Sequence, residues 1–207
     1  MRKLVALLGV ILALAGKAEA RIDTDYKGAD AGFLVGSIGF TQPELVAYRL
    51  RYRAVPSEPG SDDNGLISIS SKSIFDGRDY NDGTVEGHVI IHRLKPGTYE
   101  FFSGYVENGQ FWQTAETFSY TFTIKPGEAT YIGSFIGSQT VSKTKSIWGG
   151  DVVNGGTLRV ADEHERDFAA ARKHEPSLPP FTQTMIPDLP APLLMQKWVP
   201  QIIFVSP

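Results

Sequence analysis

The chain has no cysteine. This absence excludes a disulfide framework, a thiolate metal site and a lipid anchor on an N-terminal cysteine. We therefore expect the domain to be held together by its hydrophobic core alone.

Positive charge is not in excess either, because 20 Lys and Arg stand against 23 Asp and Glu and give a net charge of −3. A chain without a strong basic field is not expected to bind nucleic acid in general. After residue 20 the sequence also lacks an apolar run long enough to cross a bilayer, so we expect no transmembrane segment.

The motifs of common enzymes are missing as well. There is no G-x-S-x-G motif, and the glycine-rich stretch 149–156 matches neither phosphate-binding pattern. The stretch 164–168 lacks the second histidine of a zinc-protease helix. His88 and His92 would lie about 13 Å apart along a strand, too far for one metal ion. We expect a protein that is not an enzyme and that uses no cofactor.

Residues 1–20 have the layout of a secretory signal peptide. Residues 2–3 are basic, residues 4–15 are apolar, and residues 18–20 fit an A-x-A cleavage site. Because this apolar run is too short to remain in a bilayer, we expect an exported protein, periplasmic or extracellular.

From residue 31 to residue 161 the hydrophobic pattern has a period of two. Phe118, Tyr120, Phe122 and Ile124 alternate with polar residues, which is typical of a strand with one buried face. Further strands are expected at 32–40, 46–52, 66–70, 88–94, 98–106, 129–137 and 156–161. About eight short strands separated by turn residues predict an all-β fold, an antiparallel β-sandwich over residues 21–161.

Two Lys-Pro-Gly stretches, at residues 95–97 and 125–127, raise the question of a repeated binding element. Proline sets φ at the second position of a turn and glycine supplies a positive φ at the third, which is the type II pattern. The sequence between the two stretches shows no sustained repeat, so we interpret both as turns between strands.

Residues 162–175 are expected to form a short helix that lies on the sandwich. Asp162 and Glu165 resemble a capping box, and the basic residues 172–174 complement the helix dipole. Residues 176–207 are rich in proline but keep many apolar side chains. We expect an extended tail that packs either on its own domain or on a partner.

An acidic loop offers Asp76, Asp79, Asn81 and Asp82 as oxygen ligands for calcium. The EF-hand order is not met, and the same residue types are common in any turn. Calcium binding is therefore a weak candidate beside a plain turn.

Arg49, Arg51 and Arg53 would project from one face of a strand at a spacing of about 7 Å. Such a row could bind phosphate, sulfate or uronic-acid groups. It could equally pair with carboxylates across the sheet or protect a sheet edge.

Phe111 and Trp112 follow an Asn-Gly hairpin signal, and Trp148 lies in a glycine-containing loop. A tryptophan near a loop tip can stack on a sugar ring or can fill the end of a core. Both interpretations remain open.

The stretches LKPGTYEF, FTIKPGEATYIGSF and LRVADEHERDFAAARKHEPSL together resemble a group of bacterial exported or lipoprotein-type domains of unknown function. The resemblance covers about residues 31–178 and implies a prealbumin-like or immunoglobulin-like sandwich. It brings no catalytic residues, and the absence of cysteine departs from the lipoprotein members.

We predict an exported, non-enzymatic β-sandwich that acts by protein contact in the cell envelope, through the tail 176–207 or an uncovered sheet edge. The alternative is a module that binds small ligands, glycans or anions through Trp112 and the three arginines.

Overall fold

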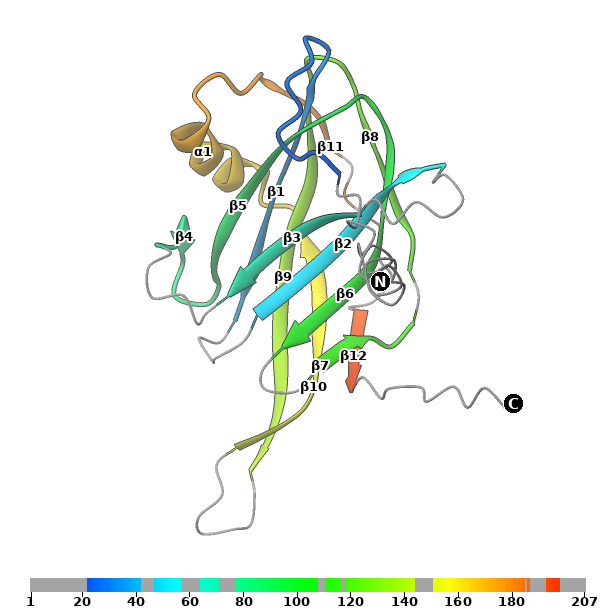
Figure 1. Cartoon of the computed structure of the whole chain (residues 1–207). Helices are drawn as coiled ribbons and strands as arrows, with labels where there is room; N and C mark the ends of the chain where they lie inside the picture. The colour runs from blue at the N-terminus through cyan, green and yellow to red at the C-terminus, as the bar shows by residue number, and fades with distance from the viewer. Residues whose placement is uncertain are drawn as a thin grey trace, which may run out of the picture.

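The protein is described by a computed structural model that covers residues 22–41, 47–56, 64–70, 77–107, 111–116, 118–143, 151–184, 186 and 193–197. The expected signal peptide and much of the tail lie outside these ranges. The described part contains twelve strands and one helix (Figure 1). The expectation of a β-rich fold with one short helix is confirmed.

Strand boundaries follow the alternation seen in the sequence. In β8, for example, Tyr120, Phe122 and Ile124 are buried while Thr121 between them is exposed. The strands are β1 Gly32–Phe40, β2 Ala47–Val55, β3 Asn64–Ser70, β4 Tyr80–Asn81, β5 Glu86–Leu94, β6 Gly97–Glu107, β7 Phe111–Thr114, β8 Tyr120–Ile124, β9 Ala129–Lys143, β10 Asp151–Ala161, β11 Phe181–Thr184 and β12 Leu193–Lys197, and the helix α1 is His164–His174.

All the strands belong to one curled sheet. Its main path runs β3-β2-β6-β7-β12-β10-β9-β1-β5-β4, with β8 beside β6 and β11 beside β9. The pairs β1–β9 and β11–β9 are parallel, and the other pairs are antiparallel. The sheet is thus a mixed half-barrel and not clearly the expected antiparallel sandwich. Alternation in a sequence reports which face of a strand is buried, but not the direction of its neighbour.

The main core fills the inside of the half-barrel. Tyr52 lies at its centre, with ring centroids 5.5 Å from Phe101 and 6.0 Å from Phe122. Gly65 on β3 makes room for this ring, because a Cβ there would lie 2.0 Å from a Tyr52 ring carbon. Tyr52 is therefore fixed in position next to β5, where its hydroxyl takes part in the site described below.

The helix α1 lies on the outer face of the sheet. Phe168 and Ala171 are buried there against Phe33 and Tyr131. The order of acidic residues in the first turn and basic residues in the last is as expected. The N-cap is Glu163, which makes no side-chain cap bond, and the expected capping residue Asp162 accepts the N–H of His164 at 3.2 Å.

A buried polar cluster, which we call the Asp167 junction, joins the helix to β1 and β9. It consists of Asp167, Arg166, Ser37, Ser134 and Tyr131. Asp167 is fully buried, and its Oδ2 accepts hydrogen bonds from Ser37 and Tyr131, each at 2.7 Å. Its Oδ1 accepts from Nε and Nη2 of Arg166, at 2.9 and 2.8 Å. Burial, and then the charge of Asp167, raise the pKa of Tyr131, so this hydroxyl stays a donor.

One of the two Lys-Pro-Gly stretches forms the expected turn. Gly127 has a φ of 68°, and the N–H of Glu128 donates to the carbonyl of Lys125 at 3.3 Å. The other stretch differs, because the carbonyl of Lys95 accepts the hydroxyl of Tyr99 at 2.7 Å instead. Both stretches connect consecutive strands, as interpreted from the sequence.

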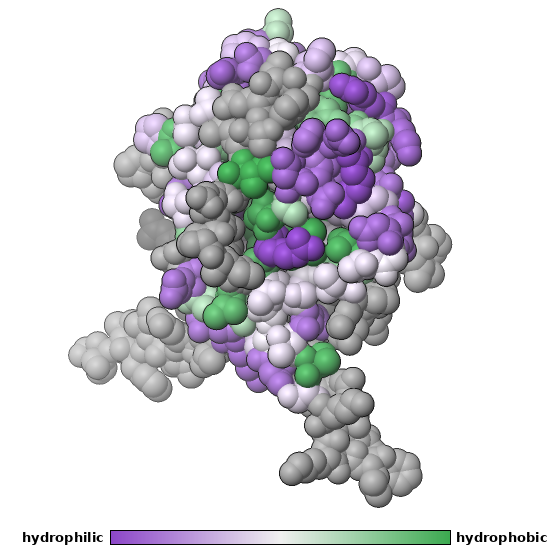
Figure 2. All heavy atoms as spheres, turned by 180° about the vertical axis from the view of Figure 1, so that it is seen from behind, coloured by the Kyte–Doolittle hydropathy of each residue, from purple (hydrophilic) through white to green (hydrophobic). Residues whose placement is uncertain are grey.

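Two strands of the tail pack on the chain itself. β11 pairs with β9, and β12 lies between β7 and β10. The face opposite to that of Figure 1 is largely hydrophilic, with hydrophobic residues gathered near its middle (Figure 2). Within the described ranges, no helix has the length and apolar character needed to cross a membrane.

Candidate functional site

The strand β5 is close to one end of the curled sheet. β1 pairs along the whole of β5, whereas β4 pairs only with Glu86 and Gly87. From residue 88 onwards, the side of β5 that faces away from β1 is hydrogen-bonded to no other strand in the described part of the chain until the N-terminal segment meets it.

The N-terminal segment closes one end of this edge. The N–H of Arg93 donates to the carbonyl of Thr24 at 2.9 Å, and the N–H of Tyr26 donates to the carbonyl of Arg93 at 3.0 Å. The N–H of Ile22 donates to the carbonyl of Asn64 in β3 at 3.4 Å. The segment therefore ties β5 to β3, at the other end of the sheet.

Asp79 closes the opposite end. Its N–H donates to the carbonyl of Gly87 at 3.0 Å, and its Oδ2 accepts the N–H of Val89 at 2.8 Å. His174, the last residue of α1, donates from Nε2 to Oδ1 at 2.6 Å, and Nδ1 of His88 is 3.5 Å from Oδ2. Burial favours the neutral acid, but the bonds from His174 and Val89 outweigh it and lower the pKa of Asp79. Asp79 is thus an ionised acceptor that caps the edge.

Three backbone groups point outward between these two ends. The outward bonds of Gly87, Val89 and Arg93 establish that odd-numbered residues of β5 face away from β1, because inward and outward groups alternate along an antiparallel strand. The C=O of Val89 and the N–H and C=O of Ile91 must then face outward. None of the three has a hydrogen-bond partner among the described residues. Unpaired groups on a strand edge are a template for another chain.

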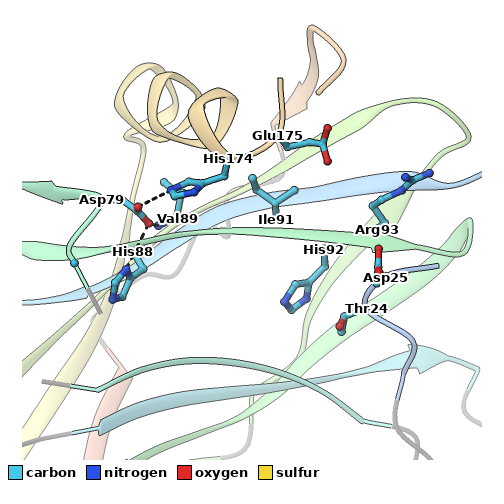
Figure 3. Close-up of a pocket in the computed structure, with 11 residues that line it drawn as sticks. Thr24, Asp25, Asp79, His88, Val89, Ile91, His92, Arg93, His174 and Glu175 are labelled. Carbon is cyan, nitrogen blue, oxygen red and sulfur yellow. Dashed lines mark hydrogen bonds and ion pairs between the residues drawn. The ribbon is translucent and has the colours of Figure 1, made fainter. Parts of the chain in front are cut away.

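A cavity of about 860 Å³ lies over this edge (Figure 3). Val89 and Ile91 lie at its centre, with the Asp79 and His174 pair on one side and Arg93 with Asp25 on the other. The remaining lining residues are Thr24, Gly77, His88, His92 and Glu175. The strand itself is therefore apolar in the middle and has charged residues at both ends, and Glu175 faces the middle from the helix side (Figure 3).

His92 forms the inner wall of the cavity. The hydroxyl of Tyr52 is hydrogen-bonded to its Nδ1 at 2.8 Å, and burial lowers the pKa of His92 to about 4. Burial also raises the pKa of Tyr52, so the hydroxyl keeps its proton. His92 is neutral at pH 7 and supports the wall without adding charge.

The three arginines lie on the outer face of β2, far along the sheet from this cavity. Arg49 is 3.3 Å from Glu107, and Arg53 is 2.6 Å from Glu100, both across the sheet on β6. Arg51 lies over the ring of Tyr105, 5.3 Å from its centroid. These contacts favour charge pairing over an anion site, because two of the three guanidinium groups are already engaged.

The structure describes two of the three aromatic candidates. Trp112 is only 6% exposed and packs in the main core, so it offers no ring face to a ligand. Its neighbour Phe111 is 54% exposed, because adjacent residues of a strand face opposite sides. Trp148 lies outside the described residues.

The acidic loop is a turn in the described part. Oδ1 of Asp82 accepts the N–H groups two and three residues further on, at 2.8 and 2.7 Å. Oδ1 of Asn81 accepts the N–H of Gly83 at 2.9 Å, and Asp79 caps β5. Asp76 lies outside the described residues. Among those described, no three His, Cys, Asp or Glu side chains converge as metal ligands.

Sequence reasoning did not identify the β5 edge as a site. It placed a strand at 88–94, but it treated Asp79, His88 and His174 as separate features. The proximity of the helix end to the acidic loop is a tertiary contact, for which a single sequence carries no signal. No family model matches this chain, and no curated protein matches it in sequence.

Proposed function

We propose that this chain is an exported, non-enzymatic protein of the cell envelope that binds an extended segment of a partner polypeptide on the free edge of β5. The single observation that carries the proposal is that the C=O of Val89 and the N–H and C=O of Ile91 point outward beneath an open cavity and have no partner within the described ranges. The layout of residues 1–20 supports export. In this proposal the half-barrel is a variant of the exported β-sandwich domains whose turn motifs resemble those of this chain.

Strand addition suits the dimensions of the edge. Six residue steps separate Gly87 from Arg93, which is about 20 Å at strand spacing and accommodates an extended segment of roughly six residues. Each new backbone hydrogen bond contributes about 0.5–1.5 kcal/mol net, and alternate side chains supply specificity. The apolar centre at Val89 and Ile91 favours a partner segment that is apolar in its middle.

A linear-peptide display library tests the proposal. Peptides selected on the full chain should lose at least about tenfold in affinity on Ile91→Pro, a loss of about 1.4 kcal/mol, because proline removes the outward N–H. The ladder to β1 does not use this N–H, so the variant should fold, which circular dichroism checks. Ile91→Val keeps the N–H and is the matched control. Selected peptides that bind Ile91→Pro as well as wild type would refute strand addition.

A small anionic ligand is a second candidate for the same cavity. Nε of Arg93 is buried and has no hydrogen-bond partner within the described part, and the guanidinium lies 5.4 Å from the centroid of the Phe33 ring. A thermal-shift panel of phosphate, sulfate and glucuronate, run on wild type and Arg93→Gln, tests it. Stabilisation of wild type alone would favour the ligand alternative over a peptide.

A further inference from the structure

The tail contains a segment that fits the free edge of β5. Residues 201–206 read Gln-Ile-Ile-Phe-Val-Ser, with Pro200 before and Pro207 after, and they lie outside the described residues. Four consecutive β-branched or aromatic residues without charge or proline are typical of a strand. Six residues extend to about 20 Å, the length of the edge between Gly87 and Arg93.

We propose that residues 201–206 of one copy of this chain add as a strand to the β5 edge of a second copy, so that copies associate head to tail. The inference rests on the proposed function of the edge and names its partner. Val89 and Ile91 lie at the middle of the edge, the Asp79 and Arg93 groups lie at its ends, and Glu175 lies on the helix side of the cavity near Ile91 (Figure 3). An uncharged segment with an apolar middle matches this distribution.

The segment cannot reach the edge of its own chain, as the strand registers show. Met195 pairs with Gly156 of β10, which pairs with Gln139 of β9. Gly137 of β9 pairs with Phe40 of β1, and Phe40 pairs with Glu86 at the start of β5. Gln139 lies two residues beyond Gly137, on the side away from the rest of β5. Lys197 lies two residues beyond Met195 in the same direction. It is therefore six residue steps from the level of His88, or roughly 20 Å along the strand direction.

The linker is too short for that distance. Residues 198–200 give four Cα–Cα steps from Lys197 to the segment, or about 14 Å when fully extended. Three strands, β10, β9 and β1, also separate β12 from β5 (Figure 1). An occupant of the edge drawn from residues 201–206 must therefore come from another molecule.

Such an interface is heterologous, because one copy contributes the segment and the other contributes the edge. An open assembly of any length keeps one free edge and one free segment, one at each end, so it grows into chains or closes into rings. A single variant on either side should stop growth, and two different variants should complement each other.

Sedimentation velocity on the full-length exported chain tests this. The weight-average mass of wild type should rise with concentration, whereas Ile91→Pro and Phe204→Pro should each remain monomeric. An equimolar mixture of the two variants should form a dimer and double the mass, because one partner retains the segment and the other retains the edge. Ile91→Val and Phe204→Val, which keep the N–H groups, are the matched controls.

Three results would overturn the inference. They are a wild type that stays monomeric at the highest attainable concentration, variants that associate as wild type does, or a mixture that fails to dimerise. If displayed peptides still bind the edge and lose affinity on Ile91→Pro, the proposed function stands and only the partner is wrong. If no peptide depends on Ile91, both proposals fail.

Discussion

The Asp167 junction and the β5 edge treat their polar groups in opposite ways. At the junction a fully buried carboxylate accepts four hydrogen bonds, from Ser37, Tyr131 and Arg166. At the edge, the C=O of Val89 and the N–H and C=O of Ile91 face a cavity and have no partner among the described residues. A fold that satisfies so demanding a buried charge is able to pair ordinary backbone groups. Their exposure at β5 therefore fits a surface kept for binding.

The largest effect is expected from Asp167→Asn. The substitution leaves the Arg166 guanidinium without its carboxylate and should lower the free energy of unfolding by about 3–5 kcal/mol. Urea unfolding measures the loss. Asp162→Asn removes an exposed partner of His164 and should cost less than about 1 kcal/mol. Equal losses in the two variants would contradict the importance of the junction.

Acid should destabilise the protein through His92. The pKa of His92 is about 4 in the folded state against 6.5 in its unperturbed form, so the unfolded state binds more protons between these values. The contribution of neutral His92 to the unfolding free energy is complete above pH 6.5. It falls by about 3 kcal/mol as the pH drops to 4. Urea unfolding at several pH values across this window measures the change. In His92→Gln the unfolding free energy should depend less steeply on pH. An unchanged slope in the variant would show that other groups cause the loss.

A smaller effect is expected where Asp79 caps the edge. Asp79→Ala frees the N–H of Val89 and should cost about 1–2 kcal/mol of unfolding free energy, as a hydrogen bond to a charged group is lost. Peptide affinity should not fall, because the free edge becomes longer. The pKa of Asp79 in the folded state lies below its ordinary value of 3.8. Asp79 therefore stabilises the fold in full above pH 3.8, and this stabilisation is lost as the pH falls through the folded-state pKa. A loss of peptide binding in Asp79→Ala would indicate that the carboxylate contacts the partner.

The smallest effect is expected on the arginine face. Arg53→Ala removes a partly exposed pair with Glu100 and should change stability by less than about 1 kcal/mol. Phosphate or glucuronate should not distinguish this variant from wild type in a thermal shift. A shift that disappears in Arg53→Ala would restore the anion site.

The parts of the fold that depend on local pattern could be predicted from the sequence. Alternation placed β8 and the burial of Tyr120, Phe122 and Ile124, and the charge order placed α1. The parallel pairing of β1 with β9 and the curl of the sheet depend on contacts between distant residues, so no local pattern reports them.

The candidate site shows the same division. A strand at 88–94 was predicted with His88 and His92 on one face. Which edge of β5 remains uncovered depends on where the N-terminal segment and Asp79 dock, and these contacts are tertiary. The sequence does not distinguish a ligand platform from a core residue at Trp112, because a residue near a loop can face either way. Its neighbour Phe111 faces the other side.

The most direct test of the β5 edge is amide hydrogen exchange in the Phe204→Pro variant, measured by NMR with and without the tightest-binding displayed peptide. The N–H of Ile90 faces β1 and should be protected in both states. The N–H of Ile91 should exchange quickly in the free protein and become protected when the peptide is bound. Protection of Ile91 in the free protein, or no change on binding, would contradict strand addition at this edge.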